Sequence, residues 1–135
     1  MARKPLSYSV MALIACMILP GCGSAQEKAA SKRIALFNEL ADRIAKIKTS
    51  ADLTAAKPDL EAIGTKIKDL EAEVKQLPKP TADEQSAMDT KYKSDDDKAA
   101  SRLQSELGRL TADVGPMAAV EVFTDLKLDP TDFAK

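Results

Sequence analysis

Cys22 is the residue whose type and position best combine to do chemistry. Its thiol can be acylated, and it closes the segment Leu19-Pro20-Gly21-Cys22, which follows an apolar stretch over residues 6–19. Arg3 and Lys4 precede that stretch. A basic start, an apolar stretch and small residues before a cleavage point are the order of a secretory signal. A stretch of fourteen residues is too short to span a bilayer comfortably.

The segment Leu19-Pro20-Gly21-Cys22 resembles the lipobox of bacterial lipoprotein precursors. The resemblance implies cleavage between Gly21 and Cys22, loss of residues 1–21, and a Cys22 that carries diacylglycerol and an N-acyl chain such as palmitate. Pro20 departs from the small residue usual at its position. An ordinary signal peptide cleaved nearby and an uncleaved apolar anchor are the alternatives. Two or three acyl chains hold a protein stably, so the membrane is an expected partner.

The residues after Cys22 bear on where the protein is anchored. In enteric members of the family an aspartate at this position retains the protein in the inner membrane. Gly23 therefore favours the outer membrane, facing the periplasm. An organism with one membrane would place the protein on the outer face of its cytoplasmic membrane. Residues 22–30 are small and polar, which predicts a flexible tether with a reach of about 15 Å.

The residue types that are missing exclude much of enzyme chemistry. The chain has no histidine and no tryptophan, and its two cysteines are Cys16 inside the signal and Cys22. Histidine-containing triads and the usual zinc or haem ligand sets are therefore absent. Serine with lysine and paired carboxylates remain, without a recognisable spacing. We expect no catalytic residue, no enzyme activity and no cofactor apart from the lipid on Cys22.

The acidic run Asp95, Asp96 and Asp97 is a weak metal candidate. A calcium loop alternates its ligands and adds a turn glycine and a later glutamate, whereas these carboxylates are consecutive. Consecutive helical side chains diverge by about 100° each. We therefore expect no metal here, only a solvated acidic patch beside neighbouring lysines.

Charge excludes a nucleic-acid partner. Loss of Arg3 and Lys4 with the signal leaves 18 of the 20 basic side chains against 21 acidic ones. Both signs are interleaved along the chain, so neither a basic footprint for nucleic acid nor a polybasic membrane patch is present.

Three helices are expected downstream of the tether. The first covers about residues 31–48, where apolar residues recur at helical spacing. Thr49 and Asp52 resemble a capping box, so the second helix starts either at Ala51 with a kink or cleanly at Pro58. Pro58 fits the first turn of a helix, which favours the clean start. A heptad seam then follows: Leu60, Ile63, Ile67, Leu70, Val74 and Leu77.

The third helix begins after the turn at Pro78 and Pro80, with Thr81 and Glu84 as a capping box, and runs to about residue 114, before Gly115-Pro116. Unbroken, it is much longer than the second helix. It either kinks near Ser94 and folds back, or its first half projects from the bundle. Projection would make Met88 and Tyr92 a partner-facing pair; packing on the second helix is the alternative.

The last segment predicts a short amphipathic helix over residues 117–127, with a strand as the alternative. Residues 128–135 are expected to form a C-terminal tail in which Phe133 covers the end of the bundle. The helical domain is thus residues 31–127. The expected fold is all-α, an antiparallel three-helix bundle or a helical hairpin with a short C-terminal helix and coiled-coil-like packing. A monomer is favoured over a coiled-coil oligomer.

These features predict a non-enzymatic, membrane-anchored envelope lipoprotein that acts as a scaffold, spacer or accessory subunit of an envelope protein. A second interpretation uses Lys135. Lipidated cysteine, small linker, heptad helix and final lysine resemble murein lipoprotein in outline, which implies a link from Lys135 to the cell wall. Five prolines from Pro58 onward depart from that family's single helix. An enzyme or ligand binder without a recognisable motif is the third interpretation.

Overall fold

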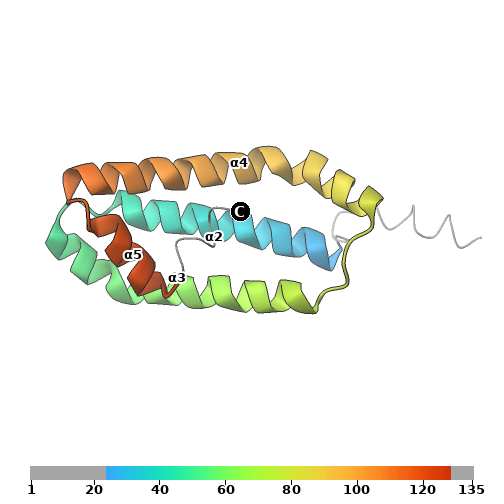
Figure 1. Ribbon diagram of the computed structural model, residues 1–135, viewed down its shortest axis with the longest axis horizontal. Coiled ribbons are helices and arrows are strands. Elements are labelled where there is room, and N and C mark those ends of the chain that lie inside the picture. The colour runs from blue at the N-terminus through green and yellow to red at the C-terminus, as the bar shows by residue number, and fades with distance from the viewer. Residues whose placement is uncertain (1–23, 129–135) are drawn as a thin grey trace, which may run out of the picture.

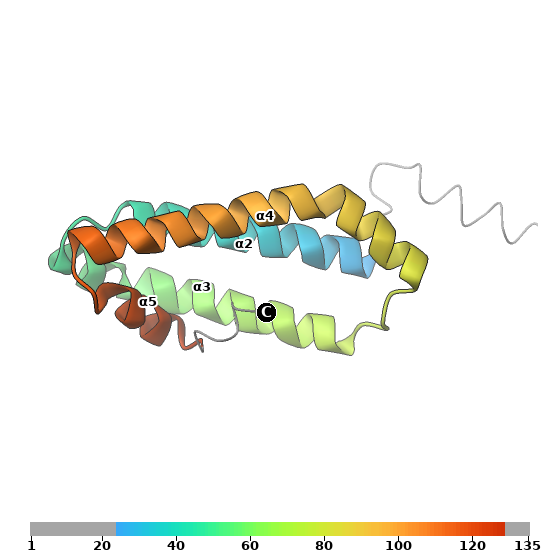
Figure 2. The ribbon, with the colours of Figure 1, turned by 45° about the horizontal axis from the view of Figure 1, so that its top comes forward.

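The computed structural model describes residues 24–128, which form an all-α bundle (Figure 1). Three long helices, α2 (Ala25–Ala45), α3 (Ser50–Gln76) and α4 (Ala82–Asp113), each run antiparallel to the preceding one, and α5 (Ala118–Leu126) is short. α2 packs on both α3 and α4, and α5 also packs on those two helices (Figure 2). The expected antiparallel three-helix bundle with a short C-terminal helix is confirmed, and the helical hairpin was wrong.

The first helix starts earlier than its sequence predicts. Ser24 is its N-cap, and the Ser24 hydroxyl accepts a hydrogen bond of 3.1 Å from the Glu27 amide. Ala29 is 5% exposed, so this turn already packs against the bundle. The prediction that residues 25–30 belong to a flexible tether was therefore wrong: alanines propagate a helix once a cap has started it.

The start at Ser50 makes Pro58 an interior residue of α3, so the expected clean start at Pro58 was wrong. The capping box between Thr49 and Asp52 is confirmed. An interior proline costs a helix about 3 kcal/mol. Leu53 lies in the added turns and is only 2% exposed, and burying a leucine stabilises by about 1.5–3 kcal/mol. The earlier start therefore gains a cap and a core residue that offset the proline.

The N-terminal cap of α3 makes the stability of the fold depend on pH. The backbone N–H groups of Lys48 and Thr49 both donate to one Asp52 carboxylate oxygen at 3.0 Å. The bond from Lys48, followed by that from the Thr49 side chain, lowers the pKa of Asp52 below its ordinary value. The stabilisation is present above the pKa of an unfolded aspartate, about 3.9, and is lost as pH falls through the lower folded value.

We therefore expect the protein to melt at a higher temperature than its Asp52→Asn variant at pH 6, with the two midpoints converging at pH 2. Asparagine retains an acceptor but not the charge, so the difference isolates the carboxylate. Circular dichroism melts of both proteins at the two pH values measure it. A midpoint difference that is the same at pH 6 and pH 2 would contradict this role of Asp52.

α4 is one continuous helix of 32 residues, so the alternative of a kink and fold-back near Ser94 was wrong. Its N-terminal capping box, Thr81 with Glu84, is confirmed. At its other end Gly115 has a φ of 138°, a conformation that side chains disfavour, and the helix stops there as the sequence predicts. The expected short helix over residues 117–127 is also confirmed, and the strand alternative was wrong.

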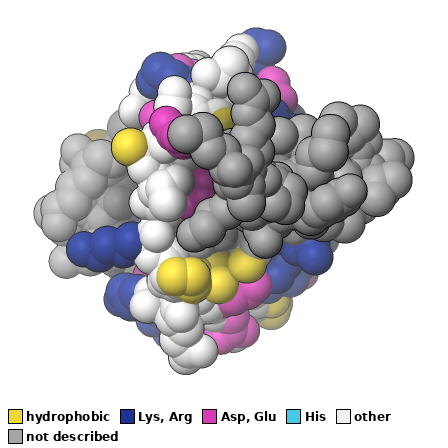
Figure 3. All heavy atoms as spheres, turned by 90° about the vertical axis from the view of Figure 1, so that its right-hand side faces the viewer, with side chains coloured by type: hydrophobic (Ala, Val, Ile, Leu, Met, Phe, Trp, Pro, Cys, Tyr) yellow, Lys and Arg dark blue, Asp and Glu magenta, His cyan; other side chains and the backbone are white. Residues whose placement is uncertain are grey.

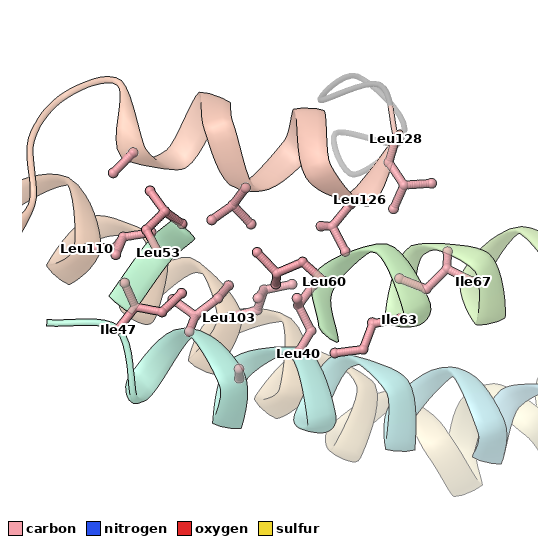
Figure 4. Close-up of a cluster of buried hydrophobic side chains, with 14 residues drawn as sticks. Leu40, Ile47, Leu53, Leu60, Ile63, Ile67, Leu103, Leu110, Leu126 and Leu128 are labelled. Atoms are coloured by element: carbon pink, nitrogen blue, oxygen red, sulfur yellow. The ribbon is translucent and has the colours of Figure 1, made fainter. Parts of the chain in front are cut away.

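The core lies between α2, α3, α4 and α5 (Figure 4). Gly64 of α3 is buried here, and a methyl group built on it would lie 2.8 Å from the carbonyl carbon of Leu126. The glycine thus lets the end of α5 rest directly on the α3 backbone. The buried cluster has fourteen members: Leu40, Ala41, Ile44, Ile47, Leu53, Leu60, Ile63, Ile67, Leu103, Leu110, Ala118, Val122, Leu126 and Leu128.

Candidate partner-binding groove

The heptad seam of α3 leaves the core as the helix proceeds. Leu60 is fully buried, Ile67 is 7% exposed and Leu70 is 9% exposed. Val74 is 47% exposed, although it has the same place in the repeat. A seam of this kind normally faces another helix along its whole length. In this protein burial is lost only at its end, where Val74 is exposed and Leu77 is half-buried, beyond the point beside Gly64 where α5 ends.

A groove continues from that point along the second half of α3. It has a volume of about 1160 Å³ and is lined by α2, the second half of α3, the Pro78–Pro80 loop, α4 and the end of α5. Figure 3 looks at the bundle from the Pro78–Pro80 end, where hydrophobic side chains lie among charged ones. The large apolar side chains of the lining are Ile34, Leu36, Phe37, Ile67, Leu70, Val74, Leu77, Met88, Tyr92, Leu103, Leu107, Phe123 and Leu128.

Met88 and Tyr92, for which the sequence left open a partner-facing role or packing on the second helix, both line this groove and are both half-buried. The Lys91 ammonium lies 5.1 Å from the centre of the Tyr92 ring and 3.2 Å from a Glu27 carboxylate oxygen. The hydrogen bond with Glu27 is the main reason why the pKa of Lys91 is raised. Glu27 belongs to α2, so these contacts fix the first half of α4 against α2. That half of α4 does not project freely from the bundle.

Phe37 of α2 is the largest buried side chain of the groove floor, at 9% exposure. The Arg33 guanidinium lies 5.2 Å from the centre of its ring and 3.4 Å from Asp96 of α4. The guanidinium therefore bridges the floor to one wall, and a cation over a ring stabilises by about 0.5–1 kcal/mol at an exposed site. Arg33 thus holds α4 against the floor of the groove.

The acidic run of α4 is paired with cations. Asp96 contacts Arg33, Asp97 lies 3.5 Å from Lys93, and Asp95 lies 3.8 Å from Lys98. Among residues 24–128 no group of three or more carboxylate or cysteine side chains is arranged to hold a metal ion. The run contributes charge to the rim of the groove.

Sequence reasoning missed most of this site. The seam residues Val74 and Leu77 are expected in the core and instead form an apolar wall. Phe37 lies on the expected apolar face of its helix and becomes the floor. The difference in helix length was the available signal. α4 has 32 residues and α2 has 21, so one end of the bundle is less completely covered.

The other predicted site residues, Gly21, Cys22 and Lys135, lie outside residues 24–128, as does the segment from residue 129. Within the described range none of the helices is both long enough and apolar enough to cross a bilayer. Fold and site define, for residues 24–128, a small helical bundle with an apolar groove. Comparison with known protein families, curated proteins and solved structures finds no match to this chain.

Proposed function

We propose that this chain is a non-enzymatic lipoprotein of the cell envelope, anchored through lipid on Cys22 and placed in the outer membrane facing the periplasm. Its bundle acts as an accessory subunit that accepts an amphipathic helix of a membrane-associated partner. The groove between α3 and α4 is the binding site. The carrying observation is the loss of burial along one uninterrupted seam, from Leu60 to Val74.

The packing of α5 favours a helix as the partner, because α5 is itself a helix that lies in the gap between α3 and α4. This nine-residue helix buries Ala118, Val122 and Leu126 against the first half of α3 and the last part of α4. From Ile67 to Leu77 the seam continues for about 15 Å. A helix of about ten residues with the same one-sided apolar pattern would extend the line of α5 and cover the seam.

The proposed lipid anchor on Cys22 favours a partner that is also located at the membrane. Gln26 donates a 2.7 Å hydrogen bond to the carbonyl of Pro78, so the start of α2 and the open end of the groove lie together. From Cys22 to Ser24 the chain can span only about 7 Å. A lipid on Cys22 therefore brings the open end of the groove to the bilayer surface.

A photo-cross-linking amino acid at Tyr92, introduced into the full chain in its native host, tests this function. We expect one reproducible partner by mass spectrometry. Its yield should fall at least about tenfold with Val74→Lys, because a charge is placed in the apolar wall. It should also fall with Cys22→Ser, which removes the anchor.

Val120→Lys is the matched control. Val120 is 49% exposed, as Val74 is, yet it lies on α5 away from the groove lining. The control should retain the cross-link. A cross-link that survives Val74→Lys, or that disappears equally with Val120→Lys, would rule out the groove as the binding site.

A further inference from the structure

The end of α5 is shaped to send the following residues along the groove. Lys127 has a φ of 55°, and the amides of Lys127 and Leu128 donate to the carbonyls of Thr124 and Phe123 at 3.0 and 3.2 Å. These two bonds form a Schellman motif, which fixes the direction in which a chain leaves a helix. Phe123 and Leu128 both line the groove.

The chain leaves α5 towards the open half of the groove. Along α3 the labelled side chains run Leu53, Leu60, Ile63 and Ile67, and Leu126 and Leu128 lie towards the Ile67 side (Figure 4). Leu128 is 8% exposed and belongs to the buried core cluster. The last described residue of the chain therefore lies at the groove.

Residues 129–135, Asp-Pro-Thr-Asp-Phe-Ala-Lys, have the length and chemistry to fill this space. Five residues from Leu128 to Phe133 can reach about 17 Å when extended. Seven residues along α3, from Ile67 to Val74, advance by about 10 Å. Phe133 is the large apolar side chain of the segment, and it can thus reach the exposed part of the seam.

Charge agrees with this placement. Lys75 and Lys79 line the groove beyond Val74, and neither makes an ion pair within residues 24–128. The segment itself contains Asp129 and Asp132, which have the opposite charge. The apolar floor, the cations of Lys75 and Lys79 and the direction in which the chain leaves α5 all favour residues 129–135 as the occupant of the groove.

We propose that residues 129–135 dock in the groove as an internal ligand, with the Phe133 ring against the Leu70 and Val74 wall. The docking itself needs no partner. Its consequence, that a partner helix must displace the segment, rests on the proposed function. The segment then sets a threshold for binding, because a partner must out-compete a ligand that is always present at high local concentration.

The chain contains no tryptophan, so Phe133→Trp introduces a single indole as a probe of this docking. The full chain, in phospholipid nanodiscs, should emit at a shorter wavelength than the free peptide of residues 129–135 with the same substitution. Adding Val74→Lys should return the emission to that of the peptide, whereas adding Val120→Lys should leave it unchanged. Far-ultraviolet circular dichroism checks that each variant is folded.

Emission equal to that of the free peptide would overturn the proposal. A short-wavelength emission that persists with Val74→Lys would also overturn it, because the indole would then be buried elsewhere, for example in lipid. This measurement contains no partner, so its failure leaves the Tyr92 cross-linking result untouched. If both hold, deletion of residues 129–135 should increase the yield of the Tyr92 cross-link, and an unchanged yield would contradict the competition.

Discussion

Gly64→Ala is expected to destabilise the protein by at least about 2 kcal/mol. The added methyl carbon would lie 2.8 Å from the Leu126 carbonyl carbon and 2.9 Å from its Cα, with the carbonyl oxygen closer still. These are backbone atoms, which cannot rotate away, so α5 must move off α3. Overpacking costs about 1–3 kcal/mol, and displacement of α5 also uncovers Val122 and Leu126. Guanidinium unfolding followed by circular dichroism measures the change.

Gly108→Ala is the matched control for that prediction. Gly108 is also a helical glycine, and a methyl group built on it meets nothing within 4 Å. Alanine there should stabilise the protein by about 0.5–1 kcal/mol through helix propensity alone. A Gly64→Ala variant that is stabilised to the same extent would show that α3 and α5 are not in this close contact.

Arg109→Ala is expected to lower the free energy of unfolding by about 2–3 kcal/mol. The Arg109 guanidinium donates to the carbonyls of Ile44 and Ile47 at 2.7 and 3.2 Å, at the C-terminal end of α2. Glu106 and Asp113 hold it at 2.8 and 3.0 Å, and the bond with Glu106 is the main reason why the pKa of Arg109 is raised. Each charged hydrogen bond contributes about 1.5–3 kcal/mol when its partner is buried, and less at this partly exposed site.

Two further variants of α4 test whether the loss of stability comes from the hydrogen bonds of Arg109 to the two carbonyls. Arg109→Lys keeps the charge but cannot reach two carbonyls with one planar group, so it should recover less than half of the loss. Arg102→Ala removes an exposed ion pair with Asp42 and should change the free energy of unfolding by less than about 1 kcal/mol. Equal losses for Arg102→Ala and Arg109→Ala would contradict a capping role for Arg109.

Local chemistry was the part of this fold that its sequence could predict. Thr49 with Asp52 and Thr81 with Glu84 start helices as expected, and Gly115 ends one. Each signal acts within four residues, so no knowledge of the fold is needed to read it. The all-α bundle then follows from helices joined by short connections.

Effects that depend on distant residues could not be predicted in this way. Arg109 lies more than sixty residues from the carbonyls it caps, and it has the spacing of an ordinary surface residue. Pro58 is tolerated because Leu53 finds a core that the local sequence does not show. The groove is the clearest case, because Val74 has the same position in the heptad repeat as Leu60 and yet is 47% exposed.

The early start of α2 has a consequence for how a partner is found. A nine-residue tether would let the bundle sweep a broad region above the membrane. A helix that begins at Ala25, with Ser24 as its N-cap, leaves only Gly23 between the cap and Cys22. If Cys22 carries the lipid as proposed, the bundle is held close to the membrane, and the encounter becomes a two-dimensional search among neighbours in the same leaflet. Partner abundance in that leaflet, more than intrinsic affinity, then governs how often the groove is filled.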